Sequence, residues 1–206
     1  MTFALNSSGL QSVDLTTRDA VKELIDGSTV STGQDDLIDS LITNVSSQIT
    51  RFLGFHTLTA SRTEQYMVGW KRRMLTLDAR PVSAVTSFKY AQYPSDIASA
   101  TERVADDYTL NKAGGWIKLH MSLIYETGTF QVTYSGGLGL TGGEVLMNHP
   151  EISHACAEQV AYRLNRVNSV GGSISTIPGA GARFTKQYML LDTVRETLSA
   201  HRRASM

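Results

Sequence analysis

The chain has 206 residues, enough for one sizeable domain with extended ends or for two small domains. Lysine plus arginine and aspartate plus glutamate number 19 each, so the formal net charge at pH 7 is zero. That balance disfavours a dedicated nucleic-acid-binding protein, whose affinity depends on neutralising phosphates. Charged residues make up only 18% of the chain. This low share fits a surface largely covered by neighbouring subunits, although compositional drift explains it equally well.

The charges are unevenly distributed along the chain. Residues 1–54 are mainly acidic, and residues 168–206 are mainly basic. The acids of the first segment are Asp14, Asp19, Glu23, Asp26, Asp35, Asp36 and Asp39. The bases of the last segment are Arg183, Lys186, Arg195, Arg202 and Arg203. Ends of opposite charge are suited to meet, either within one subunit or between neighbouring subunits.

Cysteine usage and the N-terminus indicate a cytosolic site of synthesis. The single cysteine, Cys156, rules out an internal disulfide, and its place on the apolar side of a predicted helix favours a buried thiol. The start of the chain, MTFALNSSGLQS, lacks the basic residues and the long apolar run of a signal peptide. No stretch approaches the roughly 20 apolar residues of a membrane span. We therefore expect a soluble protein made in a reducing cytosol, without a membrane partner.

Two helices are predicted near the N-terminus. Residues 17–26 begin with a capping threonine and an aspartate in the first turn, and Gly27 ends the helix. Residues 35–53 carry apolar side chains at spacings of one, three and four, which makes one broad apolar face at the helical period. Asp35 and Asp36 occupy the first turn of this second helix, where the helix dipole favours them.

From residue 62 the apolar pattern changes to a period of two, which predicts strands. The predicted strands are 62–68, 74–77, 82–90, 108–110, 116–119 and 130–134. A basic turn, Lys71-Arg72-Arg73, joins the first two, and residues 111–115 form a hairpin turn. Short sequential strands joined by turns predict an antiparallel or mixed sheet.

Helices return in the last third of the chain. Residues 150–167 follow a helical stripe that starts at Pro150, a favourable first helical position. A connector rich in glycine and serine, 168–185, is predicted to be flexible, and a last helix is predicted from about residue 186 to 202. The predicted fold class is thus α+β and mainly helical. It divides into an extension (1–14), a core (15–167) with a β insertion at about 62–134, the connector, and a C-terminal helix with a basic tail (186–206).

The stretch FQVTYSGGLGLTGG, residues 130–143, contains the pattern G-x-G-x-x-G at 137–142. A dinucleotide site requires a preceding strand, a helix that opens on the glycines, a parallel βαβ unit and an acid about 20 residues later. We expect the helix to open only at His149 or Pro150, and no strand to follow it. The acid at the right distance, Glu158, falls inside that helix. The pattern is therefore interpreted as a strand-to-helix loop, and a nucleotide-binding enzyme is kept as a less favoured alternative.

Other catalytic and metal-binding patterns are weak. His149 and His154 are five residues apart, about 140° around a helix, which disfavours a zinc site. We find neither a serine-nucleophile elbow nor a phosphate-binding loop motif. Asp106 and Asp107 fit a solvated turn, and the basic turn at 71–73 fits either a phosphate contact or an exposed hairpin tip. We therefore predict no catalytic residue, no cofactor and no metal.

Four stretches, taken in order, resemble the head–tail connector proteins of tailed bacteriophages, also called adaptor or head-completion proteins. The first is LTTRDAVKELI with QDDLIDSLITNVSSQITRFLGF, a helix pair that ends in an aromatic residue and glycine. The second is TEQYMVGWKRRMLTLDARPVSAVTSFKY, and the third is DYTLNKAGGWIKL. The fourth is FQVTYSGGLGL, followed by a helix that closes on Tyr162-Arg163. Together they span about residues 15–167, and their order and spacing carry the resemblance.

The resemblance implies a helical domain with a small β insertion and no enzyme activity. It implies a homo-oligomeric ring, typically a dodecamer, that docks on the portal of a DNA-filled head and extends the DNA channel. DNA passes through without sequence-specific binding, and a stopper or tail-completion protein binds the far side. The expected location is the head–tail interface of the virion, after synthesis in the host cytoplasm. Relatives use the C-terminal helix or tail to grip the portal, which here points to Arg183, Lys186, Arg195, Arg202 and Arg203.

The charged residues of the helix pair and of the basic turn are the candidates for contacts between subunits: Asp35, Asp36, Asp39, Lys71, Arg72 and Arg73. The nearest alternative function is another neck protein, such as a stopper or tail terminator. Those proteins are mostly β, so high helical content favours the adaptor.

Overall fold

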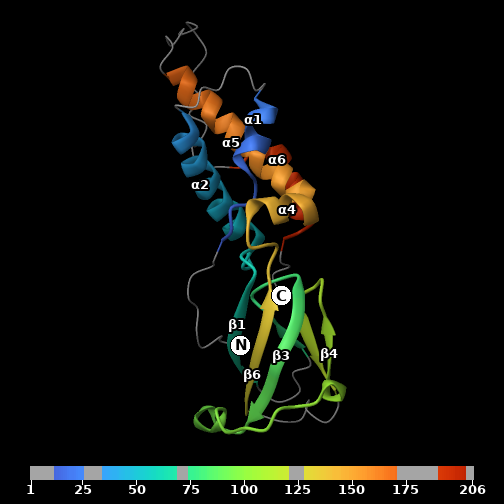
Figure 1. Cartoon of the computed structure of the whole chain (residues 1–206). Helices are drawn as coiled ribbons and strands as arrows, with labels where there is room; N and C mark the ends of the chain where they lie inside the picture. Colours follow the sequence, from blue (N-terminus) through green and yellow to red (C-terminus); the bar gives the residue numbers. More distant parts are fainter. Residues whose placement is uncertain (1–11, 26–33, 69–73, 121–127, 171–189, 203–206) are drawn as a thin grey trace, which may run out of the picture. The chain divides into compact units, whose positions relative to one another are not determined.

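The computed structural model describes residues 12–25, 34–68, 74–120, 128–170 and 190–202 (Figure 1). The chain forms two compact units. The β unit comprises Phe55–Leu140, and the helical unit comprises Val13–Gly54 together with the chain from Thr141 onward. The β unit is therefore an insertion in the sequence of the helical unit. Helices and antiparallel sheets together confirm the predicted α+β fold class.

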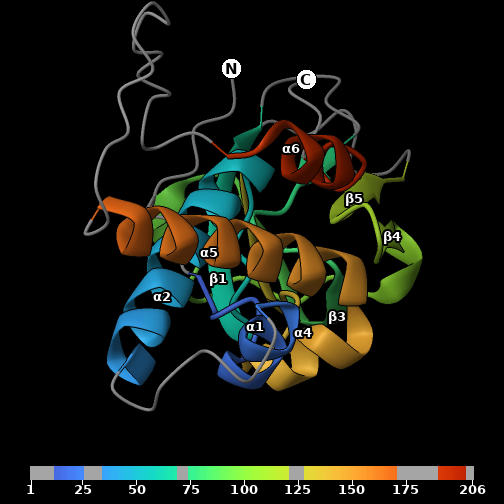
Figure 2. The same cartoon turned by 90° about the horizontal axis from the view of Figure 1, so that it is seen from above.

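The helical unit is organised around its longest helix, α5 (Pro150–Val170). Four other helices pack against α5: α1 (Arg18–Leu24), α2 (Asp35–Leu53), α4 (Gly142–Asn148) and α6 (Asp192–Ser199). In Figure 2, α1 and α6 lie on opposite sides of α5. Every helix contributes fully buried side chains to the shared core, among them Val21, Ile38, Val45, Ile49, Val145, Ile152, Val160, Leu164, Val194 and Leu198. Apolar burial on this scale is the main source of stability for such a unit.

Local signals fix the ends of several helices. The Thr17 hydroxyl caps α1 by accepting a hydrogen bond from the Ala20 N–H at 3.3 Å. Gly54 ends α2 in the left-handed conformation, with φ of 75°, and its N–H donates to the Thr50 carbonyl at 3.0 Å. The predicted range of α2, 35–53, is confirmed, and α5 begins at Pro150 as predicted.

The described residues of the β unit form two three-stranded antiparallel sheets. The first has the order β1-β6-β3, with β1 Ala60–Val68, β6 Gly128–Gly136 and β3 Val82–Ala91. The second has the order β2-β5-β4, with β2 Met74–Thr76, β5 Trp116–Leu119 and β4 Tyr108–Asn111. The observed strand bounds fall within two residues of the predicted ones. Side chains from both sheets share one core, including Phe88, Phe130, Val132, Leu75 and Ile117.

Two helical segments differ from the prediction. The chain is helical at Gly142–Asn148, where a loop up to residue 149 was expected. This short helix has no sequence periodicity to reveal it, because two of its seven residues are glycines. The last helix begins at Asp192 rather than near residue 186, and Leu190 and Leu191 are not helical. The Leu191 N–H donates to the buried side chain of Gln159 on α5 at 2.7 Å, and Leu191 has a ψ of 149°, outside the helical range.

The connector begins later than predicted. Helix α5 continues to Val170, so residues 168–170 are helical, and the rest of the predicted connector lies outside the described residues.

The two ends of the β unit are hydrogen-bonded to each other. The Leu138 N–H donates to the Thr57 carbonyl at 2.7 Å, and the Thr59 N–H donates to the Gly139 carbonyl at 2.9 Å. Gly137 sits between these bonds with φ of 138°, and a Cβ there would lie 2.5 Å from the Thr59 nitrogen. Only glycine fits this conformation and this close approach. The chain therefore leaves and rejoins the helical unit from neighbouring positions.

A buried carboxylate, Glu64 on β1, lies in the core of the β unit with 7% of its surface exposed. The hydroxyls of Tyr66 and Tyr134 both donate to this carboxylate, and the Asp78 N–H lies 3.3 Å from both of its oxygens. The Tyr134 hydroxyl also accepts a hydrogen bond from the Ala79 N–H at 2.9 Å. Tyr134 belongs to β6, and residues 78–79 follow β2, so the network links one sheet to the chain leaving the other.

Burial raises the pKa of Glu64 above its ordinary value, and the hydrogen bonds from Tyr134 and Tyr66 partly oppose the shift. The folded state therefore holds this proton more tightly than the unfolded chain. Linkage then gives the sign of the effect on stability. The contribution of Glu64 is fully present below the unfolded pKa of about 4.3 and is lost as the pH rises through the raised folded pKa.

We expect Glu64→Gln to flatten the decline in stability of the β unit as the pH rises above the unfolded pKa of about 4.3, because glutamine does not titrate. Glu64→Ala is expected to cost roughly 1–3 kcal/mol at neutral pH, since buried donors lose their acceptor. Urea unfolding followed by tryptophan fluorescence measures both effects, because Trp116 lies in β5. The matched control is Glu102→Gln, which removes an exposed carboxylate from the same unit. Equal pH slopes for Glu64→Gln and the unsubstituted chain would contradict the assignment.

Candidate assembly surfaces

A cluster of ion pairs joins α1 to α2. The Arg18 side chain donates to Asp39 at 2.9 Å and to Asp35 at 3.0 Å, and the Lys22 ammonium lies 2.6 Å from Asp35. The hydrogen bond from Lys22, reinforced by Arg18, holds the pKa of Asp35 below its ordinary value. The hydrogen bond from Arg18 does the same for the pKa of Asp39. All four side chains remain partly exposed, so salt screens their attraction.

This cluster bears on the acidic residues predicted to contact a neighbouring subunit. Asp35 and Asp39 have cationic partners within their own subunit. Asp36 is exposed and takes no part in the cluster. A neighbouring subunit would therefore compete with Arg18 and Lys22 for two of these carboxylates, but not for Asp36. The inter-subunit role of all three remains a prediction.

The basic residues predicted to face the portal are only partly described. Arg195 on α6 is exposed and lies 3.9 Å from Asp192. The Arg202 guanidinium lies 5.3 Å from the centre of the Phe52 ring, a cation–π contact that ties the end of the described chain to α2. Arg183, Lys186 and Arg203 lie outside the described residues, as do Lys71, Arg72 and Arg73 of the basic turn. The portal interface and the role of the basic turn also remain predictions.

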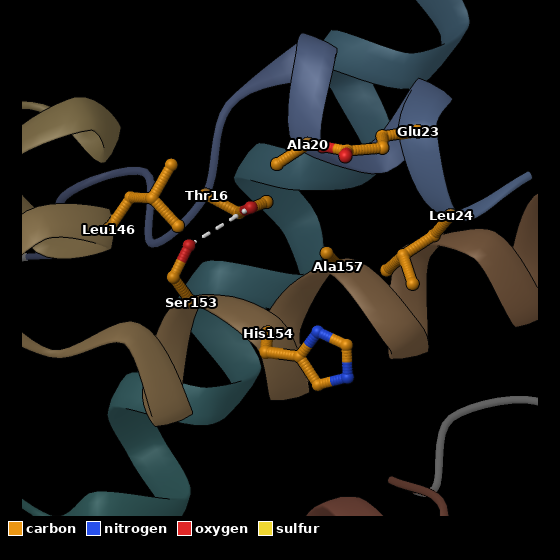
Figure 3. A pocket seen from close by; sticks show the side chains of 8 residues that line it. All are labelled: Thr16, Ala20, Glu23, Leu24, Leu146, Ser153, His154 and Ala157. Carbon is orange, nitrogen blue, oxygen red and sulfur yellow. Dashed lines mark hydrogen bonds between the residues drawn. The ribbon is translucent and has the colours of Figure 1, made fainter. Parts of the chain in front are cut away.

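A surface hollow of about 350 Å³ opens between α1, α4 and α5 (Figure 3). Leu24 of α1 and Leu146 of α4 stand at opposite ends of this hollow, and Ala20 and Ala157 line it between them. Leu24 is 44% exposed and Leu146 is 38% exposed, and the neighbouring Met147 is 78% exposed. Glu23 and His154 add polar groups to the lining. We call this feature the α1–α4–α5 hollow.

Sequence reasoning missed this hollow, because one of its walls is the unpredicted helix α4. A usable signal was present in the cluster of apolar residues Val145, Leu146 and Met147 after the glycines. Three consecutive apolar residues that precede a proline-started helix are too many for an exposed loop.

The glycine pattern at 137–142 does not form a dinucleotide site. Helix α4 begins at Gly142, the last glycine of the pattern, contrary to the expectation from sequence. The N-terminus of α4 is, however, already capped by the Thr141 hydroxyl, which accepts a hydrogen bond from the Glu144 N–H. A Cβ at Gly142 would lie 2.3 Å from the Thr16 carbonyl oxygen, so the polypeptide itself covers this glycine. The preceding strand β6 pairs antiparallel with both neighbours, whereas the dinucleotide motif needs a parallel βαβ unit.

The other chemistry-bearing residues occupy structural positions. Cys156 is fully buried, which raises the pKa of its thiol to about 12. His154 is exposed, and His149 lies 4.0 Å from Glu151, which also lies 3.5 Å from His201. Among the described residues, no group of three or more His, Cys, Asp or Glu side chains is placed to hold a metal ion. No helix in the described part of the chain combines the length and apolarity needed to cross a membrane.

We expect Asp39→Asn to destabilise the helical unit at neutral pH and to reduce its loss of stability in acid. The lowered pKa of Asp39 means that its contribution is present above the unfolded pKa of about 3.9 and is lost as the pH falls through the folded pKa. Urea unfolding followed by far-UV circular dichroism measures the effect, which should shrink in 1 M salt. Asp36→Asn is the matched control. A control variant that behaves like Asp39→Asn would rule out a specific role for the Arg18 pair.

Comparisons with known proteins place the chain in a family. Residues 14–204 match the family described as "HCP: Head completion protein". A search of curated proteins found no match. Among solved structures, a chain from the neck of an empty gene transfer agent particle, computed with C6 symmetry, is similar with a TM-score of 0.55 and 12% identity. The match covers 100% of this chain and 97% of that one.

A chain from the virion of a native gene transfer agent particle is similar with a TM-score of 0.52 and 15% identity, over 100% of this chain and 97% of that one. At such identities these likenesses concern the fold. The family match extends over almost the whole chain, across both the helical and the β unit. The chain belongs to the head completion protein family.

Proposed function

We propose that this protein is a structural virion component that forms a ring at the neck of the particle and joins the DNA-filled head to the tail. The ring docks on the portal, extends the DNA channel and offers its far side to a stopper or tail-completion protein. The protein acts by geometry and not by catalysis, and it needs no cofactor. The observation that carries this proposal is the family match over residues 14–204.

The fold similarity supports the neck as the location. The two similar chains come from gene transfer agent particles, one from a particle neck computed with C6 symmetry. A symmetric neck is built from repeated subunits, and a rotation that closes generates a ring. By analogy we propose a ring here, with the twelve subunits implied by the connector resemblance.

Features of the chain itself agree with an assembly role. Leu24 and Leu146 expose apolar surface at the α1–α4–α5 hollow, and such patches mark sites of protein contact. A net charge of zero suits a channel that lets DNA slide instead of holding it. The helical unit favours an adaptor over a stopper or tail terminator, which are mostly β.

We expect the purified chain, mixed with portal-containing heads, to add a ring of density at one vertex. Symmetry-free reconstruction of the vertex by electron cryo-microscopy should then give twelve subunits. Heads that lack the portal are the control and should bind no ring. Equal binding to both kinds of head would contradict portal docking. Complete failure to bind portal-containing heads, together with micromolar nucleotide binding by isothermal titration, would favour the enzyme alternative.

The portal contact has a separate test that leaves the buried core of the helical unit intact. Deleting the C-terminal segment would remove Val194 and Leu198, which are fully buried against the rest of the helical unit. We therefore expect the double variant Arg195→Gln and Arg203→Gln to keep its circular dichroism spectrum and to lose at least tenfold in affinity for portal-containing heads. Binding measured by co-sedimentation should fall steeply with added salt for the unsubstituted chain only.

The matched control neutralises exposed cations elsewhere, with Arg51→Gln, Lys112→Gln and Lys118→Gln. This control should bind heads normally. If both variants bind as tightly as the unsubstituted chain, the basic C-terminal residues do not make the portal contact.

A further inference from the structure

The α1–α4–α5 hollow is suited to an apolar side chain of a protein partner. Its two ends are leucines that remain more than a third exposed, and its lining includes two alanines. Small side chains between larger ones leave room for a side chain from outside. A volume of about 350 Å³ is at the lower end of the range for binding pockets, enough for one or two large side chains.

The two buried hydroxyls that line the hollow do not favour a polar small molecule. The Ser153 hydroxyl donates to the Thr16 hydroxyl at 3.1 Å, and both residues are almost fully buried (Figure 3). The proton of the Ser153 hydroxyl is therefore bonded within the protein and is not directed at a ligand. A specific small-molecule site would instead direct several unsatisfied polar groups at its ligand.

The charge of the hollow indicates the sign of its partner. Glu23 is an exposed acid in the lining, and Asp19 is exposed one helical turn earlier on α1. The nearest bases of α1, Arg18 and Lys22, are already engaged by the carboxylates of α2. The side of α1 that borders the hollow therefore offers negative charge, which complements a segment that carries both bases and apolar residues.

The chain contains such a segment at residues 183–189, with the sequence RFTKQYM. Phe184, Tyr188 and Met189 supply large apolar side chains, and Arg183 and Lys186 supply positive charge. The segment is part of residues 171–189, which lie outside the described residues. Nineteen residues can span roughly 60–70 Å when extended. For comparison, the whole of α5, with 21 residues, is only about 32 Å long. A segment of nineteen residues is therefore long enough to reach a neighbouring subunit.

The attachment of this segment favours a second copy over the segment's own subunit. The segment directly precedes Leu190, and Leu191 is hydrogen-bonded to Gln159 of α5. Ala157, which lines the hollow, lies two residues from Gln159 and hence about 200° around the helix. In Figure 2, α1 and α6 accordingly lie on opposite sides of α5. Seven residues would have to wrap around α5 to reach the hollow of the same subunit.

We propose that the α1–α4–α5 hollow binds residues 183–189 of a second copy of this chain. Phe184 or Tyr188 enters between Leu24 and Leu146, and Arg183 or Lys186 approaches Glu23. This inference rests on the proposed ring, because it supplies the contact by which one subunit holds the next.

Cysteine cross-linking tests the contact directly. The native Cys156 is fully buried, so it gives little background. A Leu24→Cys chain is mixed with a Phe184→Cys chain, and the mixture is oxidised and run on a denaturing gel. The matched control is Leu37→Cys, which places a thiol at another leucine of similar exposure on α2, outside the hollow. We expect a cross-linked dimer of Leu24→Cys with Phe184→Cys, in at least fivefold higher yield than with Leu37→Cys.

The charge pairing is tested in the same assay. Adding Glu23→Arg to the Leu24→Cys chain should lower the yield several-fold, and adding Arg183→Glu and Lys186→Glu to the Phe184→Cys chain should restore it. Absence of the dimer, or equal yields at Leu24 and Leu37, would overturn the proposal. A chain that carries both Leu24→Cys and Phe184→Cys tests the alternative. If the disulfide forms only within this chain and never between chains, the hollow binds the segment of its own subunit and the proposal is wrong.

Failure of this contact is distinguishable from failure of the proposed function. If rings form on portal-containing heads without a Leu24–Phe184 cross-link, the ring function stands and this inference is wrong. If no ring forms on heads, the proposed function is wrong whatever the cross-linking gives.

Discussion

The pair of backbone hydrogen bonds between residues 57–59 and 137–139 is the constraint on which the rest of the chain depends. The Thr57 carbonyl accepts from the Leu138 N–H, and the Thr59 N–H donates to the Gly139 carbonyl. These bonds hold the two ends of an 86-residue insertion, Phe55–Leu140, at neighbouring positions. Because the ends meet, α2 and α4 can belong to one helical core although the whole β unit separates them in sequence. The apparent phosphate-binding glycines serve this closure: Gly137 allows the close backbone approach.

The two units are stabilised by different interactions, and the contributions of these interactions to stability change with pH in opposite directions. In the helical unit, apolar faces surround α5, and the partly exposed ion pairs of Arg18 and Lys22 join α1 to α2. In the β unit, a buried carboxylate accepts hydrogen bonds from two tyrosines on neighbouring strands. Acid removes the contribution of the first and favours the protonated form of the second. The ion pairs of the helical unit are therefore intact near neutral pH, whereas Glu64 contributes most to the β unit in acid.

The strands and α2 were predictable because each carries a clear period in its own sequence. The first residue of α5 was predictable from Pro150, and the α1 cap from Thr17. Helix α4 was not, since Gly142 and Gly143 hide its start and its seven residues are too few to show a period. The start of α6 was not predictable either, because a hydrogen bond to Gln159 of another helix sets it. The candidate charged residues could be found from the distribution of charge along the sequence. The α1–α4–α5 hollow could not be predicted, because it forms only where three helices from distant parts of the sequence meet.

The sequence alone determined the fold class, the order of the elements and the resemblance to connector proteins. These depend on local periods, turn residues and their spacing, which the chain carries without reference to distant contacts. Only the tertiary structure decided which acids of α2 already have partners, and that Glu64 is buried beneath two tyrosines. It also decided that exposed leucines of α1 and α4 border one hollow. The physical reason is that burial and pairing are properties of residues brought together from afar, and no local pattern records them.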